Sequence, residues 1–173
     1  MKIRTAIGLG ALLAVSTPCF SETQLLVEYN KVNFDDTLVD VSPSSFSIGI
    51  EYDFNEHFSV LGKYGIGVQD DTGNTFFGDA QVDIDNLYGV YFKAGILPDA
   101  VAKPYALIGY TKTKLTANFN GLKFGQSEDD ISYAVGVEFD VAEKFILNLD
   151  YSQLIDNSDV DMSSFNLGVK YEF

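Results

Sequence analysis

Strict alternation of apolar and polar side chains is the feature that most constrains how this chain can fold. It is clearest over the last eight residues, Asn166–Phe173, where every second residue is apolar or aromatic. A period of two places the apolar side chains on one face of a half-buried β-strand. Similar segments occupy residues 23–32, 45–54, 58–68, 82–95, 103–115, 130–140 and 145–154. The terminal segment alone is also compatible with an ordinary edge strand.

The connections between the eight segments alternate in length. Short turns are expected near residues 55, 98 and 142, whereas long, acidic loops separate the other pairs. An even number of strands of about ten residues, with short turns on one side and long loops on the other, is typical of outer-membrane barrels. Apart from the N-terminus, no apolar run approaches the ~18–20 residues of a spanning helix. The sequence therefore predicts an all-β protein, an eight-stranded antiparallel up-and-down transmembrane β-barrel.

The first 21 residues have the pattern of an export signal. Lys2 and Arg4 form a basic segment, residues 6–15 are apolar, and Pro18 ends this run. Small residues at Cys19 and Ser21 favour cleavage after Ser21, so we expect a signal peptide over 1–21 and a barrel domain over 22–173. A retained anchor is the alternative, although the apolar run is short for spanning. A lipoprotein signal at Cys19 fits less well, because Ser-Thr-Pro precedes it.

Charge and cysteine content exclude some classes of function. Removing residues 1–21 takes two of the eleven basic residues and none of the 25 acidic ones, which lowers the net charge from −14 to −16. Nucleic acids require a positive surface, so no nucleic-acid partner is expected. The single cysteine lies in the predicted signal peptide, so the exported chain is expected to have no disulfide.

Charged residues recur at inward-facing positions of the predicted strands, three to six residues from the short-turn ends. Four acidic and three basic side chains form this predicted lumen layer: Glu28, Glu51, Lys63, Lys93, Glu138, Asp150 and Lys170. Buried charges of this kind must be paired. Because a tight turn joins their strands, Lys63 and Glu51 are expected to be partners. The layer is interpreted as a structural plug, with a gate for a narrow ion path as the alternative.

Inward glycines are expected to give these long side chains room to cross an interior that eight strands leave just wide enough to fill. They are Gly49, Gly65, Gly67, Gly89, Gly136 and Gly168. In the segment 82–95 the outward, apolar side is expected to include Val82, Ile84, Tyr88, Val90 and Phe92. Alternation in the segment 103–115 is too irregular to predict its facing.

Catalytic and metal-binding patterns are weak. The chain has one histidine, His57, in a predicted short turn, so a Ser/His/Asp arrangement at the outer rim cannot be built. The outer loops are rich in carboxylates, which can bind Ca²⁺, but residues 70–74 lack the spacing of a calcium loop, and solvated loop charge is the preferred interpretation. These acids are Asp35, Asp36, Asp40, Asp70, Asp71, Asp79, Glu128, Asp129, Asp156, Asp159 and Asp161. We expect no enzyme activity, metal site or cofactor.

Three stretches carry a resemblance to a known family: Pro104–Tyr110, Tyr133–Tyr151 and Asn166–Phe173. With them the chain resembles the OmpA/OmpX-type small outer-membrane β-barrels, without their peptidoglycan-binding domain. The resemblance implies a bacterial outer-membrane location and a monomer, with outer-membrane lipids, lipopolysaccharide, periplasmic chaperones and the assembly machinery as partners. It also implies that Asn166, Gly168, Tyr171 and Phe173 form the signal recognised during assembly.

The expected function is non-enzymatic: a surface-structural or interaction role through acidic extracellular loops, around a lumen filled by side chains. A narrow, porin-like channel for ions or small solutes is the alternative. Residue patterns name no ligand, receptor or physiological role, and they leave open whether the acidic loops bind divalent cations.

Overall fold

The computed structural model describes residues 22–36, 39–69, 71–75, 78–119, 122–156 and 161–173. The predicted signal peptide, Asp70, Asn120, Gly121 and Asp159 lie outside these residues. Regular structure in the described part is entirely β. No helix there is long and apolar enough to cross a membrane.

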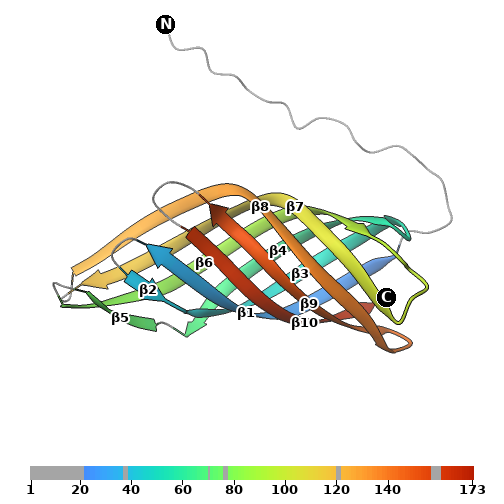
Figure 1. Ribbon diagram of the computed structural model, residues 1–173, viewed down its shortest axis with the longest axis horizontal. Helices are drawn as coiled ribbons and strands as arrows, with labels where there is room; N and C mark the ends of the chain where they lie inside the picture. The colour runs from blue at the N-terminus through green and yellow to red at the C-terminus, as the bar shows by residue number, and fades with distance from the viewer. Residues whose placement is uncertain (1–21, 37–38, 70, 76–77, 120–121, 157–160) are drawn as a thin grey trace, which may run out of the picture.

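Eight antiparallel strands form a closed barrel, which confirms the predicted fold (Figure 1). Each strand pairs with the next around the wall, and the last pairs with the first, from Gln24 opposite Glu172 to Asp35 opposite Asp161. The wall strands are β1 (Thr23–Asp36), β3 (Ser44–Asn55), β4 (Phe58–Gln69), β6 (Gly78–Gly95), β7 (Ala102–Phe119), β8 (Leu122–Ala142), β9 (Phe145–Asp156) and β10 (Asp161–Glu172).

Several segments predicted as long loops are partly strand. The short strand β2 (Val39–Val41) pairs with the outer end of β1, and β5 (Asp71–Thr75) pairs with β6. Strands β6, β7 and β8 are longer than the others and extend away from the end where both termini of the barrel lie (Figure 1). The long connection expected between the segments 103–115 and 130–140 is instead largely strand, because the outer parts of β7 and β8 pair with each other.

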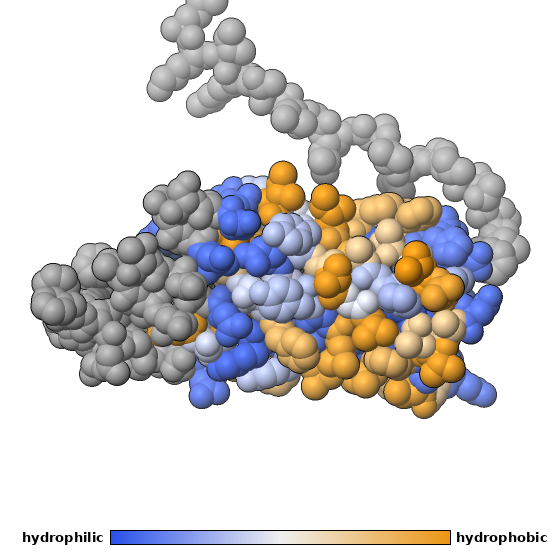
Figure 2. All heavy atoms as spheres, viewed as in Figure 1, coloured by the Kyte–Doolittle hydropathy of each residue, from blue (hydrophilic) through white to orange (hydrophobic). Residues whose placement is uncertain are grey.

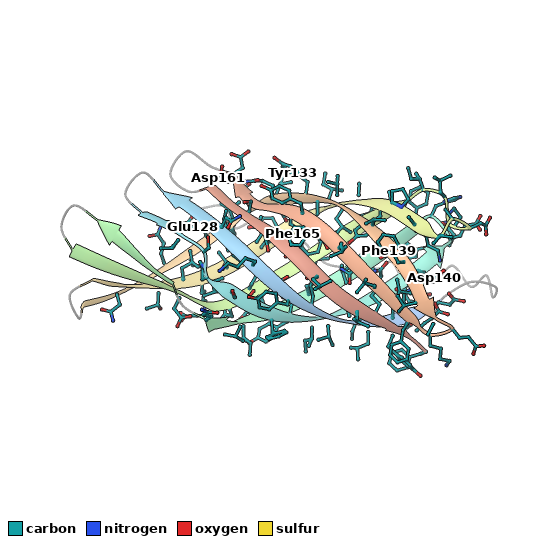
Figure 3. All side chains as sticks on the ribbon, turned by 60° about the horizontal axis from the view of Figure 1, so that its bottom comes forward. Glu128, Tyr133, Phe139, Asp140, Asp161 and Phe165 are labelled. Carbon is teal, nitrogen blue, oxygen red and sulfur yellow. The ribbon has the colours of Figure 1, made fainter. Side chains whose placement is uncertain are left out.

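The outer wall is apolar because one face of the alternation points outward. Side chains such as Ile48, Val90 and Val135 are 58–64% exposed. Exposing such apolar surface to water would be unfavourable, whereas contact with lipid is not. Figure 2 shows apolar residues gathered in a band with hydrophilic residues on either side, and Figure 3 shows Tyr133 on this outer wall. Aromatic pairs flank the band, including Tyr29–Phe46 and Tyr64–Tyr88 toward the long connections and Tyr52–Phe54 and Phe145–Tyr171 near the short turns.

A β-bulge makes one facing prediction wrong. Ile84 was expected on the lipid side, but it is 2% exposed and lies inside the barrel. The pairing of β6 with β7 shifts between Ile84 and Asn86, so Asp85 is an extra residue. One extra residue reverses the facing of every position beyond it. The side chain of Val82, beyond the bulge, is outside the described residues.

Strand β7, whose facing was not predicted, is resolved by the structure. Tyr105, Leu107 and Thr111 point into the lumen, whereas Ile108 and Tyr110 face outward. The sequence was ambiguous because apolar side chains occur on both faces of this strand.

Two tyrosines fill the lumen in space that glycines leave. Tyr91 on β6 lies opposite Gly109 on β7, and Tyr105 on β7 lies opposite Gly136 on β8. A Cβ atom at Gly109 would stand 2.2 Å from the carbonyl oxygen of Val90 and 2.7 Å from Cδ1 of Tyr91. Glycine is therefore required for this close approach of strand and ring.

Gly109→Ala is expected to destabilise the barrel by about 1–3 kcal/mol, because the added methyl must displace backbone and ring. Gly62→Ala is the matched control, since nothing lies within 4 Å of the added Cβ there. Urea unfolding in lipid vesicles measures both. Equal midpoints for the two variants would contradict the proposed fit between glycine and tyrosine.

Candidate functional site

The lumen contains most of the buried polar groups and is the candidate site. All seven predicted lumen charges are at most 8% exposed. They do not form the single layer that was expected. They divide into an inner charge cluster (Glu51, Lys93, Glu138 and Lys170), near the short turns, and a middle charge cluster (Glu28, Lys63 and Asp150).

The inner charge cluster is a closed ring of ion pairs. Lys93 Nζ lies 2.8 Å from Glu51 Oε1 and 2.6 Å from Glu138 Oε1. Lys170 Nζ lies 2.5 Å from the same Glu138 oxygen and also contacts Glu51 Oε2. Ser59 donates to Glu51 at 2.6 Å. Two acids and two bases balance, which satisfies the condition for burying charge in a dry interior.

The middle charge cluster carries one surplus acid. Lys63 Nζ donates to Glu28 Oε2 at 2.9 Å, and Asn148 donates to the other oxygen of Glu28 at 3.2 Å. Asp150 has no cation within 4 Å among the described residues. It accepts from neutral donors instead: Tyr105 Oη at 3.0 Å, Ser152 Oγ at 2.8 Å, Asn166 Nδ2 at 2.5 Å and Asn148 Nδ2 at 3.5 Å. Hydrogen bonds thus stabilise this buried carboxylate.

The expected Lys63–Glu51 pair is wrong. Strand pairing places Lys63 opposite Gly49, and Glu51 opposite Leu61. Because Gly49 has no side chain, the stem of Lys63 passes over it, and a Cβ at Gly49 would stand 3.2 Å from Lys63 Cγ. The ammonium group therefore reaches Glu28 on β1, one strand further around the wall.

Tyr91 and Tyr105 are lumen residues that sequence reasoning missed. Lys93 Nζ lies 4.9 Å and Lys170 Nζ 5.9 Å from the ring centre of Tyr105, whose hydroxyl bonds Asp150, so this side chain links the two charge clusters. Tyr91 lies 5.2 Å from Lys63 Nζ and hydrogen-bonds Thr111 at 2.7 Å. A glycine opposite each tyrosine could have identified them, but recognising such a pair requires knowledge of the register between the strands.

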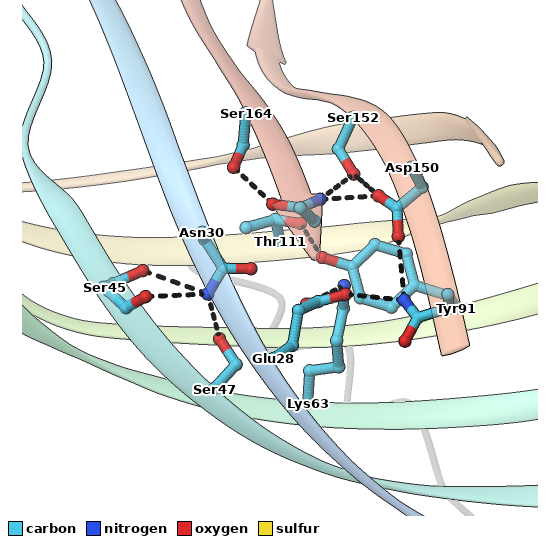
Figure 4. Close-up of polar contacts among 12 residues, drawn as sticks. Glu28, Asn30, Ser45, Ser47, Lys63, Tyr91, Thr111, Asp150, Ser152 and Ser164 are labelled. Atoms are coloured by element: carbon cyan, nitrogen blue, oxygen red, sulfur yellow. Dashed lines mark hydrogen bonds and ion pairs between the residues drawn. The ribbon is translucent and has the colours of Figure 1, made fainter. Parts of the chain in front are cut away.

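Hydroxyl and amide groups line the lumen above the middle charge cluster (Figure 4). Asn30 Nδ2 donates to Ser47 Oγ at 2.8 Å and to Ser45 Oγ at 3.2 Å. Thr111 and Ser132 share a hydrogen bond of 2.6 Å. This part of the lumen is polar but uncharged.

An apolar plug fills the lumen beyond these hydroxyl groups, toward the long connections. Its members are at most 6% exposed and come from six elements: Val32, Val41, Ile84, Leu87, Leu115, Leu154, Ile155 and Met162. Sequence reasoning missed the plug because the bulge at Asp85 reverses the facing of Ile84 and because Val41 lies on β2. The plug offers no hydrogen-bonding partner to water or ions.

The four predicted assembly-signal residues divide between the two faces of β10. Asn166 and Gly168 face the lumen, where Asn166 bonds Asp150. Tyr171 packs against Phe145 and Phe173, with ring centres 5.3 Å apart in each case, and Phe173 is 71% exposed. Recognition by the assembly machinery stays a prediction.

His57 lies exposed in the turn between β3 and β4, with Nδ1 3.3 Å from the carbonyl oxygen of Gly95 and Nε2 3.7 Å from Glu56. Within the described ranges, no group of three or more His, Cys, Asp or Glu residues is arranged to hold a metal ion.

Comparisons with known proteins agree with this architecture. The family model described as outer membrane protein beta-barrel domain matches residues 7–173. No curated protein matches the sequence. Among solved structures, Ail, the attachment invasion locus protein of Yersinia pestis, in complex with the heparin analogue sucrose octasulfate, is 18% identical with a TM-score of 0.65, over 88% of this chain and 99% of that one.

Two further structures are similar. Neisserial surface protein A is 14% identical with a TM-score of 0.65, covering 87% of this chain and 97% of that one. The N-terminal β-barrel domain of Pseudomonas aeruginosa OprF is 14% identical with a TM-score of 0.60, covering 86% and 97%. At these identities the likeness shows the fold. Because the family model spans nearly the whole sequence, the chain belongs to the family of outer-membrane proteins with this β-barrel domain, located in the bacterial outer membrane.

Proposed function

We propose that this outer-membrane protein is non-enzymatic and non-conducting, and that it acts as a surface-structural or interaction protein. The apolar plug is the observation that carries the proposal. Eight buried apolar side chains close the lumen at its extracellular end, and an apolar constriction excludes water and ions. The inner charge cluster closes it again nearer the periplasm, where its ion pairs leave no unpaired charge to attract a permeating ion.

The part that projects beyond the lipid band is the surface available for interaction. Strands β6 and β8 carry acidic side chains there, whereas β7 carries Lys112 and Lys114. Glu128 and Asp161 lie toward this end of the barrel (Figure 3). Long connections of outer-membrane barrels are extracellular. We propose that this acidic surface meets partners outside the cell, while outer-membrane lipids and lipopolysaccharide surround a monomeric wall. The assembly machinery and periplasmic chaperones are the proposed partners during biogenesis.

A narrow channel is the alternative, favoured by one observation. A cavity open toward the periplasm reaches Lys93 and Glu138 of the inner charge cluster. Ions could therefore approach the cluster from that side if the ion pairs and the plug opened together.

Planar-bilayer recording of the purified protein tests the proposal. We expect no sustained conductance in the wild type, because both closures must open at once. Insertion is checked by running the protein recovered with the bilayer lipid on a gel, because a folded barrel changes its migration when it is heated. Steady conductance whose ion preference changes in Lys93→Met would contradict the closed lumen and support the channel.

A further inference from the structure

The lumen opens at the short-turn end into a cavity of about 540 Å³, which we call the periplasmic mouth. Its volume is within the range of small-molecule sites. The inner charge cluster forms its floor through Lys93 and Glu138, and residues of the short turns and strand ends form its rim. Neither the apolar plug nor the extracellular surface contributes to it.

The rim is acidic and short of cations. Six carboxylates line it besides the floor: Glu22, Asp53, Glu56, Asp140, Glu143 and Glu172. Lys103 pairs with Asp140 at 2.6 Å, and Lys93 is engaged by the inner charge cluster. Among the described side chains, no cationic group lies within 4 Å of Glu22, Asp53, Glu143 or Glu172. The predicted cleavage after Ser21 would add one α-ammonium group at Glu22, which is fewer positive charges than the rim has carboxylates. The periplasmic mouth therefore keeps an excess of negative charge.

Gln24 gives an independent sign of a missing donor. Its side chain lines the mouth and is only 6% exposed. Gln24 Nε2 donates to Asp53 Oδ2 at 2.9 Å, whereas Gln24 Oε1 is buried without a hydrogen-bond partner in the described part of the chain. Buried acceptors are rarely left unpaired. Because the rim around this carbonyl oxygen is acidic, the donor that would complete its hydrogen bonding is expected to be an N–H group with a positive charge.

The remaining walls select between kinds of cation. Apolar side chains line the mouth together with the carboxylates, namely Phe58, Ile96, Pro98, Pro104, Val141 and Ile146. The described acids are too dispersed to hold one metal ion. Dispersed carboxylates in a cavity that also has apolar walls match a flexible chain of methylene groups interrupted by ammonium groups.

We propose that the periplasmic mouth binds linear polyamines. One ammonium group donates to Asp53 and Gln24 Oε1, a second lies near Glu172 on the adjacent strand β10, and the methylene segments pack on the apolar walls. The site is independent of the surface role proposed above, because it lies at the opposite end of the barrel.

Calorimetric titration of spermidine into the protein as purified from membranes, in zwitterionic detergent at low salt, tests this proposal. We expect saturable one-to-one binding. Asp53→Asn and Glu172→Gln should each weaken it by about five- to tenfold, as removal of one nearby charge predicts, and Gln24→Met should weaken it by removing the acceptor. Asp161→Asn and Glu128→Gln, at the far end of the barrel, make the same charge change and should leave binding within twofold. Gel migration confirms that each variant is folded.

Three results would overturn the site. Equal losses from the mouth variants and the far-end variants would indicate general attraction to an acidic protein. Mg²⁺ binding as tightly as spermidine, with the same dependence on Asp53, would indicate a metal site. Trilysine binding with spermidine inactive would replace the polyamine by a basic polypeptide.

Discussion

Lys170→Met is expected to lower the free energy of unfolding by about 3–5 kcal/mol, the cost of leaving a buried ion pair without one partner. Lys170 is 2% exposed and contacts both Glu51 and Glu138. Without it, two buried carboxylates share Lys93 alone. Methionine keeps most of the side-chain volume, so the loss reports charge rather than a cavity. Urea titration in lipid vesicles, followed by circular dichroism because the chain has no tryptophan, measures the effect.

Two further variants separate charge from general damage. Lys103→Met removes an ion pair that is partly exposed at the mouth and should cost less than about 1 kcal/mol. Adding Glu138→Gln to Lys170→Met should recover part of the loss, because one unbalanced carboxylate is neutralised. A Lys170→Met barrel as stable as the wild type would show that the lumen is wet enough to solvate its charges.

Lys63→Met is expected to have a similar effect, about 3–5 kcal/mol, because Glu28 then remains buried beside Asp150 without a cation. The identity of its partner is the sharper prediction. Glu28→Gln in the same chain should restore part of the stability, whereas Glu51→Gln should not, because Lys63 and Glu51 are not in contact. A double-mutant cycle measures each coupling energy.

A coupling to Glu28 of about 1–3 kcal/mol, against a value near zero for Glu51, would fit the structure. Coupling of equal size to both acids would mean that the two charge clusters act as one layer, contrary to the arrangement described here. The side-chain stem of Lys63 passes over Gly49, which explains why its partner is Glu28 on β1 and not Glu51 on β3, the strand joined to β4 by the tight turn.

Alternation predicts wall and lumen well where strands are regular. In β3 and β10, residues such as Ile48, Ile50 and Leu167 face outward, and their neighbours face the lumen. The register has no shift over residues 45–53 of β3 and 163–171 of β10, so the period of two holds there. Burial of all seven lumen charges follows from the same rule. Within a regular strand, the alternation is therefore enough to predict which face each side chain occupies.

Features that depend on pairing between strands could not be derived from this pattern. The bulge at Asp85 is a property of β6 and β7 together, so Ile84 was placed on the wrong face. The inward position of Tyr105 depends on Gly136 opposite it. Which acid Lys63 meets depends on how far its side chain reaches across the lumen. Each of these requires the register between strands and the length of the side chains, which local sequence does not specify.

The seam between β1 and β10 joins the two ends of the described chain, from Gln24 opposite Glu172 to Asp35 opposite Asp161. Contacts so distant in sequence must overcome a large loop-closure entropy before they contribute stability, so closure is expected to be slow and late in folding. Until β10 arrives, β1 presents an unpaired edge along its length, which invites pairing with other chains. The pairing of β10 with β1 is thus expected to determine both the rate of folding and the length of time during which the chain can aggregate.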